Sequence, residues 1–250
     1  MKSLPYIRPL RLIPVLLAAA TICAGPLKTV AAEPAKDQPV RMVIVGDSTV
    51  CNYPDDNVRR GWGMFIQGYF NSNQVQVVNL AKSGRSTKTF IKEGLWAAAL
   101  KMKPDYVLIQ FGHNDSHAPE KPEATDAKTT FRQFLAQYID ETRGIGARPV
   151  LVTPMCRREF GADGKIKNSL QPYAEAMKAV AKEKNVPLVD LNTASVELCN
   201  QLGATACDGL ANDAKDKTHF NAKGAKEMAR LVMEKLPVVE PSLKQYEAGH

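Results

Sequence analysis

The segment MVIVGDST (residues 42–49) decides the fold class of this 250-residue chain. Residues 42–46 form a short apolar run, which ends at Gly46 and Asp47. Four more runs of this kind follow, each rich in Val, Ile or Leu, as is typical of strands that are buried on both faces. They lie at residues 75–81, 106–112, 149–154 and 186–191.

Helical patterns lie between these predicted strands. Apolar residues recur at spacings of three and four in the segments that begin at Trp62, Phe131 and Ala225, and more loosely after Leu170. We interpret these stripes, Trp62 included, as core-facing. Strands that alternate with helices predict βαβ units. We therefore expect an α/β protein with a doubly wound, five-stranded parallel sheet, a core over about residues 42–236 and a loose terminus after it.

The first 32 residues resemble a secretory signal peptide. Lys2, Arg8 and Arg11 make a basic start, an apolar run covers residues 12–23, and small residues at 30–32 offer a cleavage site. The apolar run has 12 residues, fewer than the roughly 20 that a spanning helix needs. We therefore expect export to the periplasm or the medium, no stable membrane insertion, and a single domain over residues 33–250.

The charge of the chain argues against a nucleic-acid partner. The formal charge is +7 for the whole chain, but residues 1–32 hold four basic and no acidic residues, so residues 33–250 carry only +3. Binding to nucleic acid needs a clustered basic face, and the sequence has no long Lys/Arg run. We expect no nucleic-acid partner, and we expect a monomer.

Four cysteines follow the predicted signal peptide, and export permits disulfides. Cys199 and Cys207 are close enough in sequence to clip one loop, whereas Cys51 and Cys156 either pair or remain free thiols. No CxxC motif and no Cys/His cluster with zinc spacing occurs in the sequence. We therefore expect no metal and no cofactor.

Polar residues gather where the predicted strands end. GDST (46–49), SGRS (83–86), GHND (112–115) and MCRR (155–158) follow the first four strands, and DKTH (216–219) precedes the last helix. The carboxyl ends of parallel strands meet at one edge of the sheet, where doubly wound proteins bind ligands. We expect the active site at this edge.

These polar residues can form a nucleophile and its supporting groups. Ser48 needs a neighbouring base; His219 can serve, with Asp216 holding its tautomer. The amides of Ser48 and Gly84 and the side chain of Asn114 can donate to an oxyanion. Each residue alone is also an ordinary turn or capping residue, so only their joint order along the chain indicates an active site.

That order resembles the GDSL-type (SGNH) hydrolases, whose four sequence blocks carry Ser, Gly, Asn and His. The resemblance spans about residues 42–236. It implies a flavodoxin-like three-layer α/β/α sandwich with strand order 2-1-3-4-5. It also implies a nucleophile, a base and an orienting acid at Ser48, His219 and Asp216, and an oxyanion hole made by Ser48, Gly84 and Asn114.

Finer features resemble the rhamnogalacturonan acetylesterase branch, carbohydrate esterase family twelve, whose members remove acetyl groups from pectin. They are GDSTV (46–50), GRST (84–87), FGHND (111–115), VTPMCRREF (152–160) and THFNAKGA (218–225). The resemblance implies an exported serine esterase that acts on an acetylated polysaccharide or oligosaccharide. The alternatives are an esterase for acetylated xylan, acetylated peptidoglycan or a lipid ester, and a carbohydrate-binding protein on an inactive hydrolase scaffold.

Four further residues of these motifs have two interpretations each. Arg157 and Arg158 either bind galacturonate carboxylates of a pectin chain or form a solvated surface pair. His113 either binds substrate or braces the third loop. Asp115 either competes with Asp216 as the partner of His219 or is a turn residue.

Overall fold

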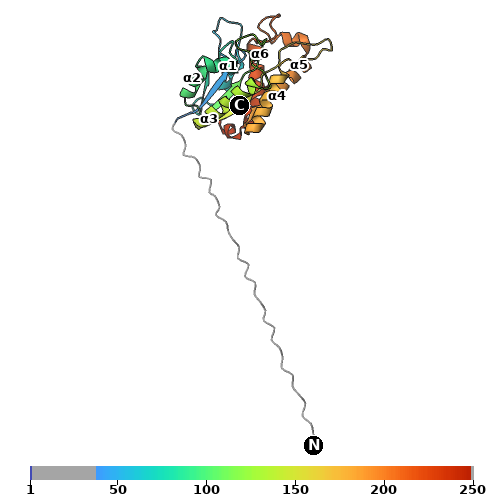
Figure 1. The fold of residues 1–250 in the computed structure, drawn as a ribbon. Helices are drawn as coiled ribbons and strands as arrows, with labels where there is room; N and C mark the ends of the chain where they lie inside the picture. Colours follow the sequence, from blue (N-terminus) through green and yellow to red (C-terminus); the bar gives the residue numbers. More distant parts are fainter. Residues whose placement is uncertain (2–37, 249–250) are drawn as a thin grey trace. The chain divides into compact units, whose positions relative to one another are not determined.

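A five-stranded parallel sheet forms the centre of the fold (Figure 1). The strands pair side by side in the order β2-β1-β3-β4-β5, which confirms the predicted fold. They are β1 (Val40–Gly46), β2 (Val75–Asn79), β3 (Tyr106–Gln110), β4 (Arg148–Val152) and the short β5 (Leu188–Val189).

The computed structural model describes residue 1 and residues 38–248. The predicted signal peptide therefore lies, apart from Met1, outside the described residues. Within the described part of the chain, no helix is long and apolar enough to cross a membrane.

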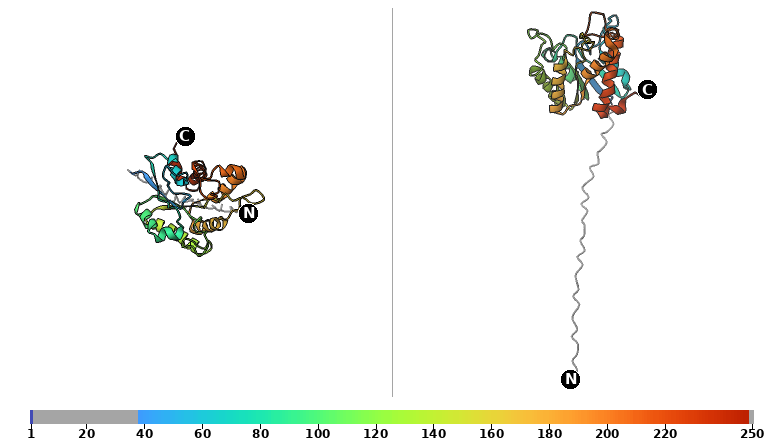
Figure 2. Two further views of the ribbon diagram at one scale, coloured as in Figure 1. Left: turned by 90° about the horizontal axis from the view of Figure 1, so that it is seen from above. Right: turned by 90° about the vertical axis from the view of Figure 1, so that its right-hand side faces the viewer.

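Helices cover both faces of the sheet, because β1 sends alternate side chains into two separate cores. Met42 and Ile44 join one buried cluster, and Val43 and Val45 join the other. The first core lies under η1 (Trp62–Tyr69), α5 (Leu191–Asp208), α6 (Ala222–Val239) and η2 (Pro241–Tyr246). The second lies under α1 (Thr87–Lys92), α2 (Leu95–Lys101), α3 (Thr130–Gly144) and α4 (Gln171–Lys184), so the three layers are evident in Figure 2.

The segment after β1 differs from the expected α-helix. Trp62 and Ile66 are buried, as their spacing predicts, but η1 is a 3-10 helix. Gly63 and Gly68 fall within its eight residues, and glycine lowers the preference of a segment for the α-helix. The indole Nε1 of Trp62 donates to Gln110 Oε1 at 2.7 Å, so this residue belongs to the core between η1 and β3.

The expectation of a loose C-terminal tail is wrong. Helix α6 continues to Val239, and η2 follows it with Leu243 fully buried. Pro241 lies in the first turn of η2, where a missing N–H costs nothing. Glu240 pairs with Arg148 Nη1 at 3.0 Å, and Ala248 donates to the carbonyl of Tyr69 at 2.9 Å. The tail therefore stays packed on the core in spite of Pro241.

We expect Leu243→Ala to lower the free energy of unfolding by about 2–5 kcal/mol, because it removes a fully buried side chain and leaves a cavity. Urea unfolding followed by circular dichroism measures the change. Lys244→Ala, at the exposed neighbouring position, should change stability by no more than about 0.5 kcal/mol. Equal stability of the two variants would show that the tail does not contribute to the fold.

The cysteines at residues 51, 156, 199 and 207 are all buried free thiols. Cys156 packs with Cys199 and Cys207 in one small apolar cluster that does not include Cys51. Of the two outcomes that the sequence left open for Cys51 and Cys156, the structure has the free thiols. Among residues 38–248, no group of three or more His, Cys, Asp or Glu side chains is arranged to hold a metal ion.

Candidate active site

The turn after β1 brings its polar residues to the carboxyl edge of the sheet. A Cβ atom on Gly46 would lie 2.7 Å from the carbonyl oxygen of Gln110 and 2.7 Å from Cγ2 of Val50. These contacts are closer than real Cβ atoms adopt, so this position needs glycine. The chain can therefore turn sharply against β3 directly after the strand.

Hydrogen bonds fix the conformation of this turn around Ser48. The Oδ1 atom of Asp47 accepts from the amide and the hydroxyl of Thr49 at 2.8 and 2.7 Å, an arrangement that stabilises tight turns. The hydroxyl of Tyr53 donates to the carbonyl of Ser48 at 2.9 Å. The serine hydroxyl itself is left to face the loop that follows α5.

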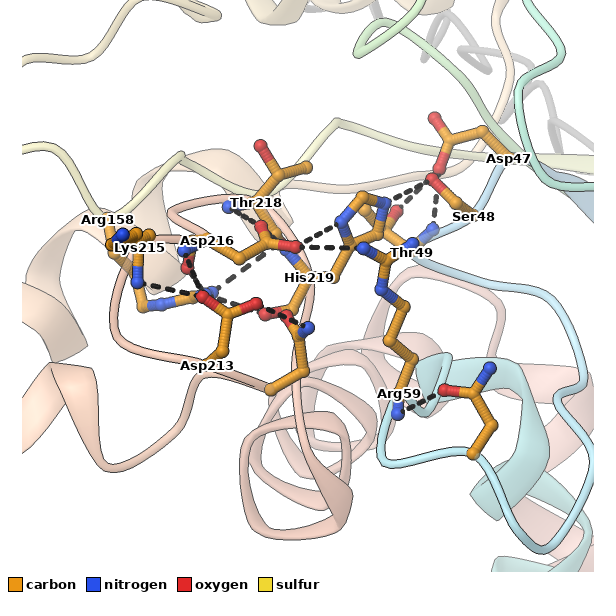
Figure 3. Close-up of polar contacts among 12 residues, drawn as sticks. Asp47, Ser48, Thr49, Arg59, Arg158, Asp213, Lys215, Asp216, Thr218 and His219 are labelled. Carbon is orange, nitrogen blue, oxygen red and sulfur yellow. Dashed lines mark hydrogen bonds and ion pairs between the residues drawn. The ribbon is translucent and has the colours of Figure 1, made fainter.

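Three side chains from two distant segments meet there in a line. Ser48 Oγ lies 2.9 Å from His219 Nε2, and His219 Nδ1 lies 2.8 Å from Asp216 Oδ2 (Figure 3). A carboxylate at Nδ1 holds the ring proton there and leaves Nε2 able to accept the serine proton. This geometry can activate a hydroxyl for attack on an acyl carbon.

Asp216 is held in its ionised form by its own loop. Its Oδ1 accepts the backbone N–H groups of Thr218 and His219, both at 2.9 Å. Burial raises the pKa of the Asp216 carboxyl, but the backbone and ring N–H groups of His219 and the N–H of Thr218 lower it more. Its pKa therefore lies below the ordinary value, and the group is charged at neutral pH.

The three groups predicted to bind an oxyanion lie in the loops that follow β1, β2 and β3. The amides of Ser48 and Gly84 make no hydrogen bond with any other described residue. Gly84 has a φ of +78°, in the left-handed region that favours glycine. The Asn114 side chain donates to the carbonyl of Arg85 at 2.9 Å, so it lies against the loop that carries Gly84.

Asp115 is not the partner of His219. It is fully buried and accepts from the amide of Gly112, the amide and hydroxyl of Thr87, and the hydroxyl of Thr125. Burial raises its pKa to about 7, against the opposing effect of these donors. Asp115 thus joins the loop after β3 to the start of α1, as its interpretation as a turn residue requires.

Comparison with known proteins identifies the family. The sequence model of the GDSL-like lipase/acylhydrolase family matches residues 44–227. The chain belongs to this family. It is therefore a carboxylic ester hydrolase, which confirms the predicted reaction class.

Individual relatives of the esterase agree with this assignment. It is 38% identical to the rhamnogalacturonan acetylesterase RhgT of Bacillus subtilis, over 84% of this chain and 94% of the relative. An acetylxylan esterase from Xylanibacter ruminicola is 26% identical over 79% of this chain and 43% of its own. The crystal structure of YxiM from Bacillus subtilis has a TM-score of 0.72 and 28% identity, over 80% of this chain and 57% of that one.

Arg158 of the esterase supports the loop that carries Asp216 and His219. Its guanidinium donates to the carbonyls of Asp216 at 2.9 Å, His219 at 2.7 Å and Thr218 at 3.5 Å, and lies 4.3 Å from the centre of the Phe220 ring. The residue is only 1% exposed. This position does not fit the predicted contact with a substrate carboxylate, because carbonyl groups of the protein occupy the guanidinium.

Arg157 has a similar bracing position. One of its terminal nitrogens donates to the carbonyl of His113 and to Ser116 Oγ, both at 3.1 Å, and the other to Ser169 Oγ at 3.2 Å. It therefore ties the loop after β4 to the loop after β3. A contact of Arg157 with substrate stays a prediction.

His113 lies beneath the site, paired with Asp47. It is 3% exposed, and its Nδ1 lies 3.4 Å from Asp47 Oδ2. Within residues 38–248, that oxygen and both ring nitrogens of His113 have no hydrogen bond. Burial raises the pKa of the Asp47 carboxyl, but the neighbouring His113 ring and the hydrogen bonds from Thr49 lower it more, to below its ordinary value. The pair joins the turn that carries Ser48 to the loop that carries Asn114, which fits the interpretation that His113 braces the third loop. A contact of His113 with substrate stays a prediction.

We expect His113→Ala to destabilise the esterase by about 3–5 kcal/mol, because it leaves the Asp47 carboxylate buried without its partner. Adding Asp47→Asn removes that buried charge, so the double variant should lose less than the sum of the two single losses. Urea unfolding of the four proteins measures this difference. Strictly additive losses would contradict a coupled pair.

Sequence reasoning missed one residue at the site, Arg59. Its Nη2 lies 3.5 Å from Asp216 Oδ2, and its side chain is 40% exposed (Figure 3). It belongs to the loop between β1 and η1, outside all the motifs that mark the strand ends. Only the approach of this loop to the His219 loop places Arg59 there, and no local sequence pattern signals that approach.

Proposed function

We propose that this esterase removes acetyl groups from rhamnogalacturonan, a pectic polysaccharide, through an acyl-enzyme intermediate. The observation that carries the mechanism is the line of contacts from Ser48 Oγ to His219 Nε2 and from His219 Nδ1 to Asp216. The substrate rests on similarity: two Bacillus subtilis proteins, one named a rhamnogalacturonan acetylesterase and one a probable one, are 38% and 37% identical to this chain.

In the first half of the reaction, Ser48 Oγ bonds to the acetyl carbonyl carbon while its proton moves to His219 Nε2. The carbonyl oxygen becomes negative and accepts hydrogen bonds from the amides of Ser48 and Gly84 and from the Asn114 side chain. Such donors typically contribute about 10²–10³ each to the rate. The bond from the acetyl carbon to the sugar oxygen then breaks.

Proton transfer by His219 completes both halves. Protonated Nε2 gives its proton to the departing sugar oxygen, so that the sugar leaves as an alcohol. The acetyl group stays bound to Ser48. A water molecule then attacks this ester and loses a proton to Nε2. The Ser48 oxygen takes the proton back as acetate leaves. Throughout, the Asp216 carboxylate accepts the Nδ1 proton in a hydrogen bond and stabilises the charged ring.

We also propose that the esterase is exported, so that it meets its substrate outside the cytoplasm. The support is the pattern of residues 1–32, with a basic start, a 12-residue apolar run and small residues before residue 33. N-terminal sequencing of the protein from the periplasm and the medium tests this proposal. An uncleaved N-terminus in the cytoplasm would contradict it.

Acetate release from native acetylated rhamnogalacturonan tests the substrate. Acetylated xylan is assayed in parallel, and both polysaccharides after saponification serve as blanks. We expect faster release from the pectic polymer, and none with Ser48→Ala. Release from xylan alone, or from neither polymer while a small acetyl ester is cleaved, would contradict the substrate and leave the mechanism intact.

A further inference from the structure

Arg59 presents a guanidinium to solvent beside the proposed catalytic residues. The two arginines after β4 are occupied, Arg158 by backbone carbonyls and Arg157 by a carbonyl and two hydroxyls. The Arg59 guanidinium, in contrast, has one contact among the described residues, with Asp216 Oδ2 at 3.5 Å. That distance is longer than the roughly 2.7–2.9 Å of strong charged hydrogen bonds, so further N–H groups remain open to a ligand.

The backbone holds Arg59 at this position. Its amide donates to Asn57 Oδ1 at 2.8 Å, and the amide of the next residue, Arg60, donates to the carbonyl of Phe220 at 2.9 Å. Phe220 directly follows His219, so this bridge fastens the Arg59 loop to the catalytic loop. Figure 3 shows the result, with the Arg59 guanidinium next to the His219–Asp216 pair.

The neighbouring Arg60 lies in the same exposed loop, but its guanidinium is not free to bind a ligand. Arg60 folds back on its own loop and donates to the carbonyls of Pro54, Asp55, Asn57 and Arg59. Arg59 makes none of these internal contacts. Its charge therefore lies partly exposed to solvent beside Asp216.

The charge of Asp216 does not cancel that of Arg59. The carboxylate already accepts two backbone N–H groups and the ring N–H of His219 at 2.8–2.9 Å. It can therefore stay ionised without a close salt bridge to Arg59. A planar guanidinium with open N–H groups matches the two oxygens of a carboxylate.

We propose that Arg59 binds a uronate carboxylate of the polysaccharide while the acetyl ester lies at Ser48, and that it selects anionic over neutral chains. This inference rests on the proposed function and deepens it. It assigns the carboxylate contact, which the sequence suggested for Arg157 and Arg158, to a residue of the loop between β1 and η1. Acetyl esters on neutral polysaccharides would lack this contact.

The test compares two forms of one substrate. Acetylated rhamnogalacturonan oligosaccharides are used as free acids and with their carboxyl groups converted to methyl esters, which removes the charge and keeps the acetyl groups. The measured quantity is the ratio of kcat/KM for the two forms. Any effect of a substitution on Asp216 or His219 acts on both forms equally and cancels in this ratio.

We expect the wild type to favour the free acid by about 10–100-fold, because hydrogen bonds between charged groups contribute about this much. Arg59→Gln should bring the ratio close to one, and Arg59→Lys should retain part of the preference. Lys217→Gln is the matched control, because it removes a cation of the catalytic loop that pairs with Asp208 instead; its ratio should equal that of the wild type. High salt should weaken the wild-type preference.

An unchanged ratio in Arg59→Gln, with acetate still released from both forms, would overturn the inference and leave the proposed function standing. No release from either form by the wild type, with a small acetyl ester still cleaved, would overturn the proposed function and the inference together. Circular dichroism of Arg59→Gln confirms that the variant is folded, as expected for a side chain that is 40% exposed.

Discussion

Ser48→Ala is expected to lower kcat for a small acetyl ester by about 10⁴–10⁶-fold, the range typical of serine hydrolases that lose their nucleophile. The substitution removes one oxygen atom, whose hydrogen bond is with His219 Nε2. The turn keeps its other bonds, from Thr49 to Asp47 and from Tyr53 to the carbonyl of Ser48. The variant should therefore fold normally and fail only in the chemical step.

Release of nitrophenol from its acetate ester measures the loss, and urea unfolding shows that stability is kept. Ser72→Ala serves as the control, because Ser72 is exposed in the turn before β2. A serine-reactive phosphonate should label the wild type and the Ser72 variant once, at Ser48. Retention of more than about one hundredth of the activity by Ser48→Ala would contradict a serine nucleophile.

Asp216→Asn is expected to lower kcat by about 10⁴-fold while it leaves the loop in place. The amide oxygen can still accept the backbone N–H groups of Thr218 and His219, as Oδ1 of the carboxylate does. The amide nitrogen, however, would face His219 Nδ1 and donate to it. The ring proton then moves to Nε2, and the ring can no longer accept the proton of Ser48.

A matched control for this substitution lies three residues earlier. Asp213→Asn changes the same functional group in the same loop, where Oδ1 accepts the amides of Lys215 and Asp216 without a contact to the ring of His219. We expect it to keep nearly full kcat. Similar losses in the two variants would mean that the loop, rather than the carboxylate at Nδ1, sets the rate.

The sheet could be predicted from sequence because its signal is local. Each strand is a short apolar run, and β1 buries side chains on both faces, so its run shows no alternation of polar and apolar residues. The strand order came from the resemblance to SGNH hydrolases, and the structure agrees with it. The polar motifs come together for a simple reason: parallel strands bring their carboxyl ends to one edge.

The surroundings of the arginines and of His113 were beyond sequence reasoning. The pair Arg157–Arg158 follows a strand just as a ligand-binding motif does, and only the packed loop shows that carbonyls surround Arg158. The pairing of His113 with Asp47 depends on β1 and β3 being neighbours. Arg59 carries no local pattern at all. For each of these residues, the groups that surround the side chain in the folded protein decide its role, and its position in a sequence motif does not.

The bond between Ser48 and His219 joins residues that are 171 positions apart in the chain. Contacts of such long range form late when a protein folds, because much chain must be ordered before they close. Secondary structure can develop earlier, from local contacts alone. The rate at which ester hydrolysis recovers after dilution from urea therefore reports when the segment that carries His219 packs against Ser48. Activity thus measures the last stage of folding directly.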